Sequence, residues 1–242
     1  MRNLVIFAII RNLLSQRSDT MPQNIDTIIF DLDGTLLDTL TDLTNSVNYA
    51  MERFGFPLHS EDAVRQMVGN GVTVLMEKAI PGGHDFPEFD RCLKEFQEHY
   101  ALHKKDFTCP FPGILDFLKK ASESGYKLAV VSNKFDLAVK GLCEDFFTPY
   151  ITAAIGESPQ VARKPAPDTV FAAMKELQSP PERCVYVGDS DVDITTAENS
   201  GIPCICVSWG FRSREFLLSH GAKYIADRAD DMWEILSDMQ AL

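Results

Sequence analysis

The chain has 242 residues, of which 45% are hydrophobic and 24% are charged, so its composition is globular and excludes a disordered or collagen-like chain. Its 35 acidic residues outnumber 23 basic ones and give a formal net charge of −12, which argues against nucleic acid and anionic membranes as partners. The six cysteines are scattered, mostly within apolar runs, a pattern typical of reduced core residues in a cytoplasmic protein.

Residues 1–24 precede the first predicted strand, and we expect them to form an appendage to the folded unit. Leu4–Ile10 is the longest apolar run in this segment and is much shorter than the roughly 18–20 residues of a membrane-spanning helix. It follows Arg2, as in a secretory signal, but no small-residue cleavage site occurs before Ser15–Asp19. We therefore favour an appendage over a secretory signal.

Apolar and β-branched runs predict strands along the rest of the chain, and helical patterns alternate with them. Continuous apolar runs are typical of parallel strands that are buried on both faces. The alternation predicts an α/β fold with a doubly wound parallel sheet. The predicted strands are Thr27–Phe30, Lys127–Ser132, Tyr150–Ile155, Cys184–Gly188, Pro203–Ser208 and Ala222–Ile225. The predicted helices are Gly113–Ser124, Phe135–Leu142, Asp168–Leu177, Asp193–Asn199 and Asp231–Met239.

One interval, residues 39–106, interrupts this alternation and carries only amphipathic helical patterns. The chain returns through Cys109–Gly113, where two prolines predict a stiff, hinge-like segment. We therefore expect a core formed by residues 25–38 and 107–242, with a helical insertion at 39–106. The helices expected in the insertion are Leu40–Phe54, Glu61–Met67, Val72–Ala79 and Glu88–Ala101.

The most informative segment is Ile28–Asp38, in which a buried strand ends in two aspartates. Strand periodicity points Asp31 and Asp33 the same way, toward the carboxyl edge of the sheet, where open α/β sheets bind ligands. Two carboxylates this close call for a cation such as Mg²⁺, which prefers oxygen ligands. Gly34 then permits a sharp turn and a close approach of the backbone to a ligand. Alternatively, an aspartate in this place could cap the following helix, but a cap requires only one aspartate and leaves the second unexplained.

The run Asp31-Leu32-Asp33-Gly34-Thr35 resembles the first signature of the haloacid dehalogenase superfamily, in its phosphatase branch. This resemblance implies that Asp31 is the nucleophile that attacks phosphorus and becomes an aspartyl phosphate. It also implies that Asp33 is the general acid that protonates the leaving alcohol and then the base that activates water.

Two further segments resemble the second and third signatures of this superfamily. Val130–Lys134 ends a predicted strand, and the resemblance implies that Ser132 and the amides around Asn133 hold the phosphate. A serine in that place is otherwise explained by a turn or a helix cap. In Arg163–Asp168, the resemblance implies that Lys164 neutralises the nucleophile and the transferred phosphoryl group.

Val185–Asp193 ends another predicted strand in a second acidic cluster and resembles the fourth signature. The resemblance implies Mg²⁺ as the cofactor. Asp31, Asp189 and the main-chain carbonyl of Asp33 would bind it, while Asp193 would orient these ligands.

The helical insertion lies between the first and second signatures, which resembles the first class of cap in the superfamily, a lid that closes over the site. Its loop Val68–Val72 is framed by glycines and would bring Asn70 toward the substrate, although a plain turn between helices explains the loop equally well. From Ile25 to about Leu236 the chain most resembles bacterial phosphoglycolate phosphatases. That resemblance implies hydrolysis of a small phosphorylated metabolite, 2-phosphoglycolate.

Two other functions stay open at this point. A phosphohexomutase of the β-phosphoglucomutase type shares every catalytic residue and differs in whether a sugar or water accepts the phosphoryl group. A receiver-like signalling module also combines acidic residues, a lysine, Mg²⁺ and a phosphorylated aspartate, but the length and the insertion argue against it. The sequence does not decide between a monomer and a homodimer.

Overall fold

The computed structural model describes residues 25–241 of the chain. The predicted N-terminal appendage, including its apolar run Leu4–Ile10, lies outside the described residues. Within residues 25–241, every helix is too short or too polar to cross a bilayer.

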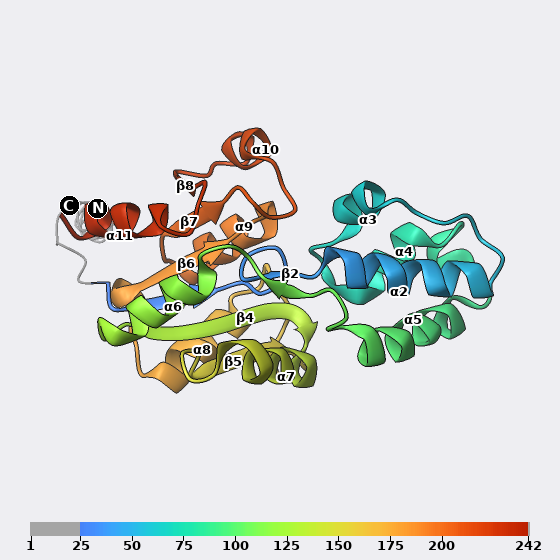
Figure 1. Ribbon diagram of the computed structural model, residues 1–242, viewed down its shortest axis with the longest axis horizontal. Helices are drawn as coiled ribbons and strands as arrows, with labels where there is room; N and C mark the ends of the chain where they lie inside the picture. Colours follow the sequence, from blue (N-terminus) through green and yellow to red (C-terminus); the bar gives the residue numbers. More distant parts are fainter. Residues whose placement is uncertain (1–24, 242) are drawn as a thin grey trace, which may run out of the picture.

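A six-stranded sheet with the order β5-β4-β1-β6-β7-β8 forms the centre of the molecule (Figure 1). Every neighbouring pair in it is parallel, which confirms the predicted doubly wound α/β fold. The strands are β1 (Thr27–Phe30), β4 (Lys127–Phe135), β5 (Ala153–Glu157), β6 (Cys184–Gly188), β7 (Cys204–Val207) and β8 (Tyr224–Ala226).

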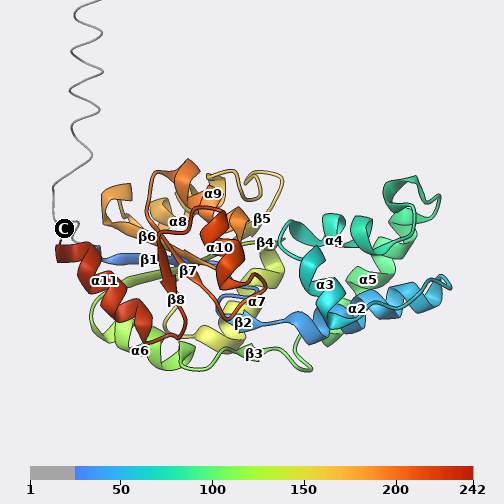
Figure 2. The same ribbon diagram turned by 90° about the horizontal axis from the view of Figure 1, so that it is seen from above.

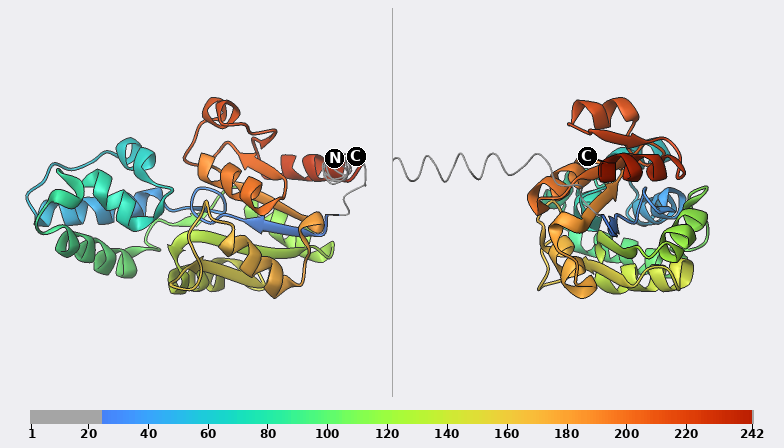
Figure 3. Two further views of the ribbon diagram at one scale, coloured as in Figure 1. Left: turned by 180° about the vertical axis from the view of Figure 1, so that it is seen from behind. Right: turned by 90° about the vertical axis from the view of Figure 1, so that its left-hand side faces the viewer.

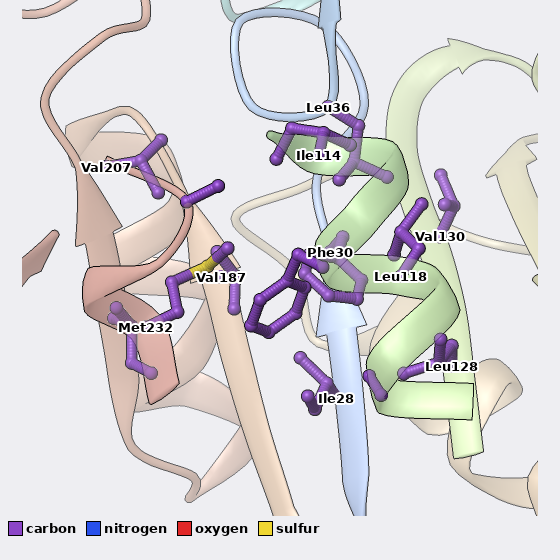
Figure 4. Packing of buried hydrophobic residues seen from close by; sticks show 14 of the residues in the cluster. Ile28, Phe30, Leu36, Ile114, Leu118, Leu128, Val130, Val187, Val207 and Met232 are labelled. Carbon is purple, nitrogen blue, oxygen red and sulfur yellow. The ribbon is translucent and has the colours of Figure 1, made fainter. Parts of the chain in front are cut away.

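Helices cover both faces of this sheet, because successive side chains of each strand point to opposite faces (Figure 2). Ile28 and Phe30 of β1 pack with α6, α7 and α11, whereas Ile29 packs with α8 and α9. Figure 4 shows Phe30 between Val187 of β6 and Leu118 of α6. The helices are α6 (Ile114–Glu123), α7 (Asp136–Phe147), α8 (Asp168–Leu177), α9 (Asp191–Ser200), α10 (Arg214–Ser219) and α11 (Asp231–Ala241).

Strand β4 extends to Phe135 and so passes the predicted end at Ser132. Phe135 pairs with Glu157 of β5 after a shift in register, and the Gly156 N–H donates to the Asp136 carboxylate at 2.9 Å. Pairing with β5 therefore keeps the β4 backbone extended beyond Ser132, although the apolar run from which the strand was predicted ends there.

Four α-helices and one short 3-10 helix form a separate helical unit between residues 39 and 108. They are α2 (Leu40–Arg53), α3 (Glu61–Met67), α4 (Gly71–Ala79), the 3-10 helix η1 (Gly83–Asp85) and α5 (Phe89–His103). Their apolar faces share a hydrophobic cluster that includes Val47, Met76 and Phe96. Figures 1 and 3 show the helical unit beyond the end of the sheet toward which the arrow of β4 points. The unit therefore lies next to the carboxyl ends of the strands.

The two connections to the helical unit pair with each other as a short antiparallel ribbon, which the sequence did not predict. It is formed by β2 (Leu37–Asp38) and β3 (Cys109–Pro110). The buried carboxylate of Asp42, in α2, accepts the N–H of Phe107 at 3.1 Å and the N–H of Thr108 at 2.9 Å. The predicted hinge-like segment, Cys109–Gly113, thus begins in this ribbon, and the two residues before it are tied to the start of the helical unit.

Candidate active site

A cavity opens where the carboxyl ends of β1, β4 and β6 meet the helical unit. The chain turns from β1 toward β4 and β5 on one side and later places β6 on the other side, which makes this a topological switch point of the sheet. The cavity encloses about 50 Å³. Its lining residues are Asp31, Asp33, Ser132, Asn133, Lys134, Lys164, Asp189, Ser190, Phe211 and Arg212 from the core, with Leu43, Val68, Gly69, Gly71, Val72 and Leu75 from the helical unit.

A buried acidic cluster adjoins this cavity, which Asp31 and Asp189 line. Asp31, Asp189 and Asp193 each offer an oxygen atom within 4.8 Å of the other two. Lys164 Nζ lies 2.7 Å from Asp31 Oδ1 and 2.8 Å from Asp193 Oδ1. Three carboxylates against one ammonium leave an excess of two negative charges, in a place where unbalanced charge is costly.

The acid–base properties of this cluster reflect that imbalance. Burial raises the pKa of Asp31 to about 7 against the opposing effect of Lys164, and the charge of Asp193 adds to the rise. Burial, followed by the charges of Asp193 and Asp31, also raises the pKa of Asp189 well above its usual range. A hard divalent cation with oxygen ligands, such as Mg²⁺, fits both the charge and the donor atoms.

Hydrogen bonds occupy both oxygens of Asp193, as they do in Asp189, which accepts from Thr35 Oγ1 at 3.5 Å and from the Phe211 N–H at 2.6 Å. In Asp193, Oδ1 accepts from Lys164 Nζ at 2.8 Å and from Tyr186 Oη at 2.9 Å. Oδ2 accepts from Ser190 Oγ at 2.6 Å and from the Asp189 N–H at 3.2 Å. In contrast, Oδ2 of Asp31 accepts no hydrogen bond from residues 25–241. The hydrogen bonds of Asp193 therefore fix the side chains of Lys164, Tyr186 and Ser190. Asp31 keeps one oxygen without a hydrogen bond from this part of the chain.

Two glycines leave the space that Asp189 occupies. Gly34 has a φ of +87°, and a Cβ there would lie 2.5 Å from Asp189 Oδ2. A Cβ on Gly210 would lie 2.4 Å from the Cβ of Asp189. The predicted sharp turn at Gly34 is present, and the close approach that it permits is to the Asp189 carboxylate.

The end of β4 supplies polar groups to the opposite wall. Ser132 is buried, and its hydroxyl accepts the Lys134 N–H at 3.2 Å. Asn133 Nδ2 donates to the carbonyl of Lys164 at 3.0 Å and to that of Gly69 at 3.2 Å. Its Oδ1 is buried without a hydrogen-bond partner in the described part of the chain.

The glycine-framed loop of the helical unit lies over the cavity. Gly69, Gly71 and Val72 line it, whereas Asn70, which we expected to face the substrate, is absent from its lining. The Asn70 carbonyl instead accepts from Arg163 Nη1 at 3.5 Å.

Lys134 and Arg212 are cavity residues to which sequence reasoning gave no role. Lys134 directly follows Ser132 and Asn133, so its place in that signature could have indicated it. Arg212 belongs to no signature. Its Nη2 donates to the Val68 carbonyl at 2.9 Å, where α3 ends, and this contact between distant segments appears only in three dimensions.

Together the fold and the site define an α/β protein with a buried cluster of carboxylates at a switch point of its parallel sheet. The family model for haloacid dehalogenase-like hydrolases matches residues 28–207, and the chain belongs to this family.

The relatives of the chain include phosphoglycolate phosphatases. It is 34% identical over 191 residues to a phosphoglycolate phosphatase from Mesorhizobium japonicum, an alignment that covers 77% of this chain and 84% of the relative. A predicted phosphoglycolate phosphatase from Lactobacillus delbrueckii subsp. bulgaricus has a similar crystal structure, with a TM-score of 0.84, 40% identity and coverage of 88% and 98% of the two chains. The structure of CbbY from Rhodobacter sphaeroides in complex with phosphate has a TM-score of 0.71, 27% identity and coverage of 86% and 96%. This family membership makes the protein a phosphoric monoester hydrolase.

Proposed function

We propose that the protein is a Mg²⁺-dependent phosphatase that hydrolyses 2-phosphoglycolate to glycolate and phosphate through an aspartyl phosphate on Asp31. The observation that carries the proposal is the position of Asp31, directly after the central strand, with one oxygen held by Lys164 at 2.7 Å and the other free to attack. Phosphoglycolate phosphatases among the relatives support the choice of substrate.

Asp31 and Asp189, with the main-chain carbonyl of Asp33, would hold Mg²⁺, and Asp193 would keep Asp189 and Lys164 in place. When bound, the ion supplies positive charge that neutralises the phosphoryl oxygens. Lys164 adds a second positive charge beside the nucleophile. The Ser132 hydroxyl and the backbone amides around Asn133 would donate hydrogen bonds to the same oxygens.

Hydrolysis then takes two displacements at phosphorus. In the first, Asp31 Oδ2 forms a bond to phosphorus, the bond to the glycolate oxygen breaks, and Asp33 gives its proton to that oxygen. In the second, Asp33 takes a proton from water, whose oxygen displaces Asp31 and releases phosphate. Splitting one difficult displacement into two is the advantage of a covalent intermediate.

The helical unit would act as a cap over these steps, with residues 39–106 as its extent. Its loop brings the apolar side chains of Val68 and Val72 to the cavity, and Leu43 and Leu75 complete that wall.

A phosphate-release assay over small phosphate esters, each with and without Mg²⁺, tests the proposal. We expect Mg²⁺-dependent release, with the highest kcat/KM for 2-phosphoglycolate. Isomerisation of a hexose phosphate without phosphate release would instead indicate the phosphohexomutase. Lasting phosphorylation of Asp31 without turnover would indicate the receiver-like module.

A further inference from the structure

Lys134 joins the core to the helical unit through two hydrogen bonds that the proposed chemistry does not use. Its Nζ donates to Asp33 Oδ1 at 2.9 Å and to Tyr100 Oη at 2.9 Å. The same Nζ lies 4.7 Å from the centre of the Tyr100 ring. The Lys134 side chain is only 7% exposed, so these contacts replace the water that would otherwise surround an ammonium.

The three residues come from three separate segments. Asp33 follows β1, Lys134 lies at the end of β4, and Tyr100 belongs to α5 of the helical unit. Tyr100 is buried, and its ring stacks on Phe96 inside the hydrophobic cluster of that unit. Within residues 25–241, Tyr100 is the sole side chain of the helical unit that hydrogen-bonds to the Asp33–Lys134 pair.

The two carboxylate oxygens of Asp33 have different surroundings. Oδ1 accepts from Lys134, while Oδ2 accepts no hydrogen bond from the described residues and belongs to a side chain that lines the cavity. A lysine stem has four rotatable carbons, so a single acceptor leaves the direction of its ammonium poorly fixed. Two acceptors, Asp33 and Tyr100, fix the position of the ammonium and through it the orientation of the Asp33 carboxylate.

We propose that Lys134 and Tyr100 are positioning residues that make the orientation of Asp33 depend on the docking of the helical unit against the core. The inference rests on the proposed function, in which Asp33 transfers the proton. When the helical unit moves away, Lys134 loses the Tyr100 hydroxyl and ring, and Asp33 loses its fixed orientation. Proton transfer to the leaving oxygen is then efficient only while the site is covered.

The leaving group offers a way to test this coupling, because only some esters need the proton. The alkoxide of glycolate is a poor leaving group and depends on the acid. Acetate from acetyl phosphate and nitrophenolate from p-nitrophenyl phosphate leave without one. The parameter kcat/KM reports steps up to the first departure of the leaving group, so it isolates proton donation from the later activation of water.

The experiment compares Tyr100→Phe, which removes one hydroxyl and keeps the ring, with wild type on 2-phosphoglycolate and on the better of the two activated esters. We expect kcat/KM for 2-phosphoglycolate to fall about 10-fold, a part of the 10²- to 10⁴-fold that a general acid contributes. For the activated ester we expect a change of less than about 2-fold, because no proton is needed.

Two further variants sharpen the comparison. Tyr49→Phe removes a phenol hydroxyl from α2 that lies 3.5 Å from Arg53, outside the network, and should behave as wild type on both esters. Lys134→Met should show the same selective loss, and adding Tyr100→Phe to it should cause little further loss because both act through Asp33. If Lys134→Met does not fold, as judged by circular dichroism, Tyr100→Phe alone decides.

An equal loss on both esters, or no loss on either, for Tyr100→Phe would overturn the inference. The first result would mean that the tyrosine only holds the fold together, and the second that Asp33 needs no such support. Failure of the proposed function is distinguishable, since wild-type protein would then release no phosphate from 2-phosphoglycolate.

Discussion

Lys164 Nζ lies 2.7 Å from Asp31 Oδ1, so the central strand and the loop before α8 meet at one buried ion pair. Both side chains are almost fully buried, with exposed fractions of 3% for Lys164 and 11% for Asp31. This pair places a positive charge next to the free oxygen of Asp31. We expect removal of Asp31 to abolish activity and removal of Lys164 to lower stability.

Replacing Asp31 tests its role as the nucleophile. Asp31→Asn keeps the size of the side chain but removes the oxygen nucleophile, so we expect phosphate release to fall by more than about 1,000-fold. Circular dichroism should show a retained fold. Asp191→Asn, a neighbouring aspartate outside the cavity lining, serves as the control and should keep its activity. Substantial phosphate release by Asp31→Asn would remove Asp31 from the mechanism.

Replacing Lys164 tests the charge balance of the acidic cluster. Lys164→Met leaves the buried carboxylates without their ammonium, and breaking a buried pair in this way typically costs about 3–5 kcal/mol. We expect the free energy of unfolding, measured by urea denaturation without metal, to fall by an amount of that order. Added Mg²⁺ should recover part of the loss, because it replaces the missing positive charge. Equal free energies of unfolding for the variant and wild type would show that the Lys164 ammonium does not stabilise the acidic cluster.

Asp189 gives the clearest test of metal binding. Without metal, its charge is disfavoured by burial and by Asp193 and Asp31, so Asp189→Asn should leave the Tm of the metal-free protein unchanged or higher. Wild-type protein should gain in Tm when Mg²⁺ is added after chelation, while the variant should lose that gain. Chelation should likewise abolish phosphate release by wild type, and Mg²⁺ should restore it. An equal Mg²⁺-induced rise in Tm in both proteins would place the ion elsewhere.

Asp42 tests how firmly the helical unit is tied to the core. Asp42→Ala leaves the buried N–H and hydroxyl groups of Thr108 without their acceptor, and an unsatisfied buried donor costs about 1–3 kcal/mol. We expect a loss of that size in the free energy of unfolding, measured by chemical denaturation. Glu52→Ala, an exposed position on the same helix, is the matched control. Equal stability of the two variants would contradict a tie at Asp42.

The sequence determined the sheet and the carboxylates at its edge. The bounds of β1, β6 and α8 agree with those predicted, because a continuous apolar run or an amphipathic repeat is a local property of the chain. The same holds for Asp31 and Asp189, which directly follow their strands and therefore had to meet at one edge of a parallel sheet.

Tertiary structure alone decided how the helical unit meets the core. The two-residue strands β2 and β3 have no periodicity to detect, and they exist only because distant segments pair. Likewise, the hold of Arg212 on the end of α3 and the bond from Lys134 to Tyr100 depend on docking between surfaces far apart in the chain. Sequence patterns report neighbours along the chain, whereas these contacts join residues that are far apart in the chain and meet only where the helical unit lies against the core.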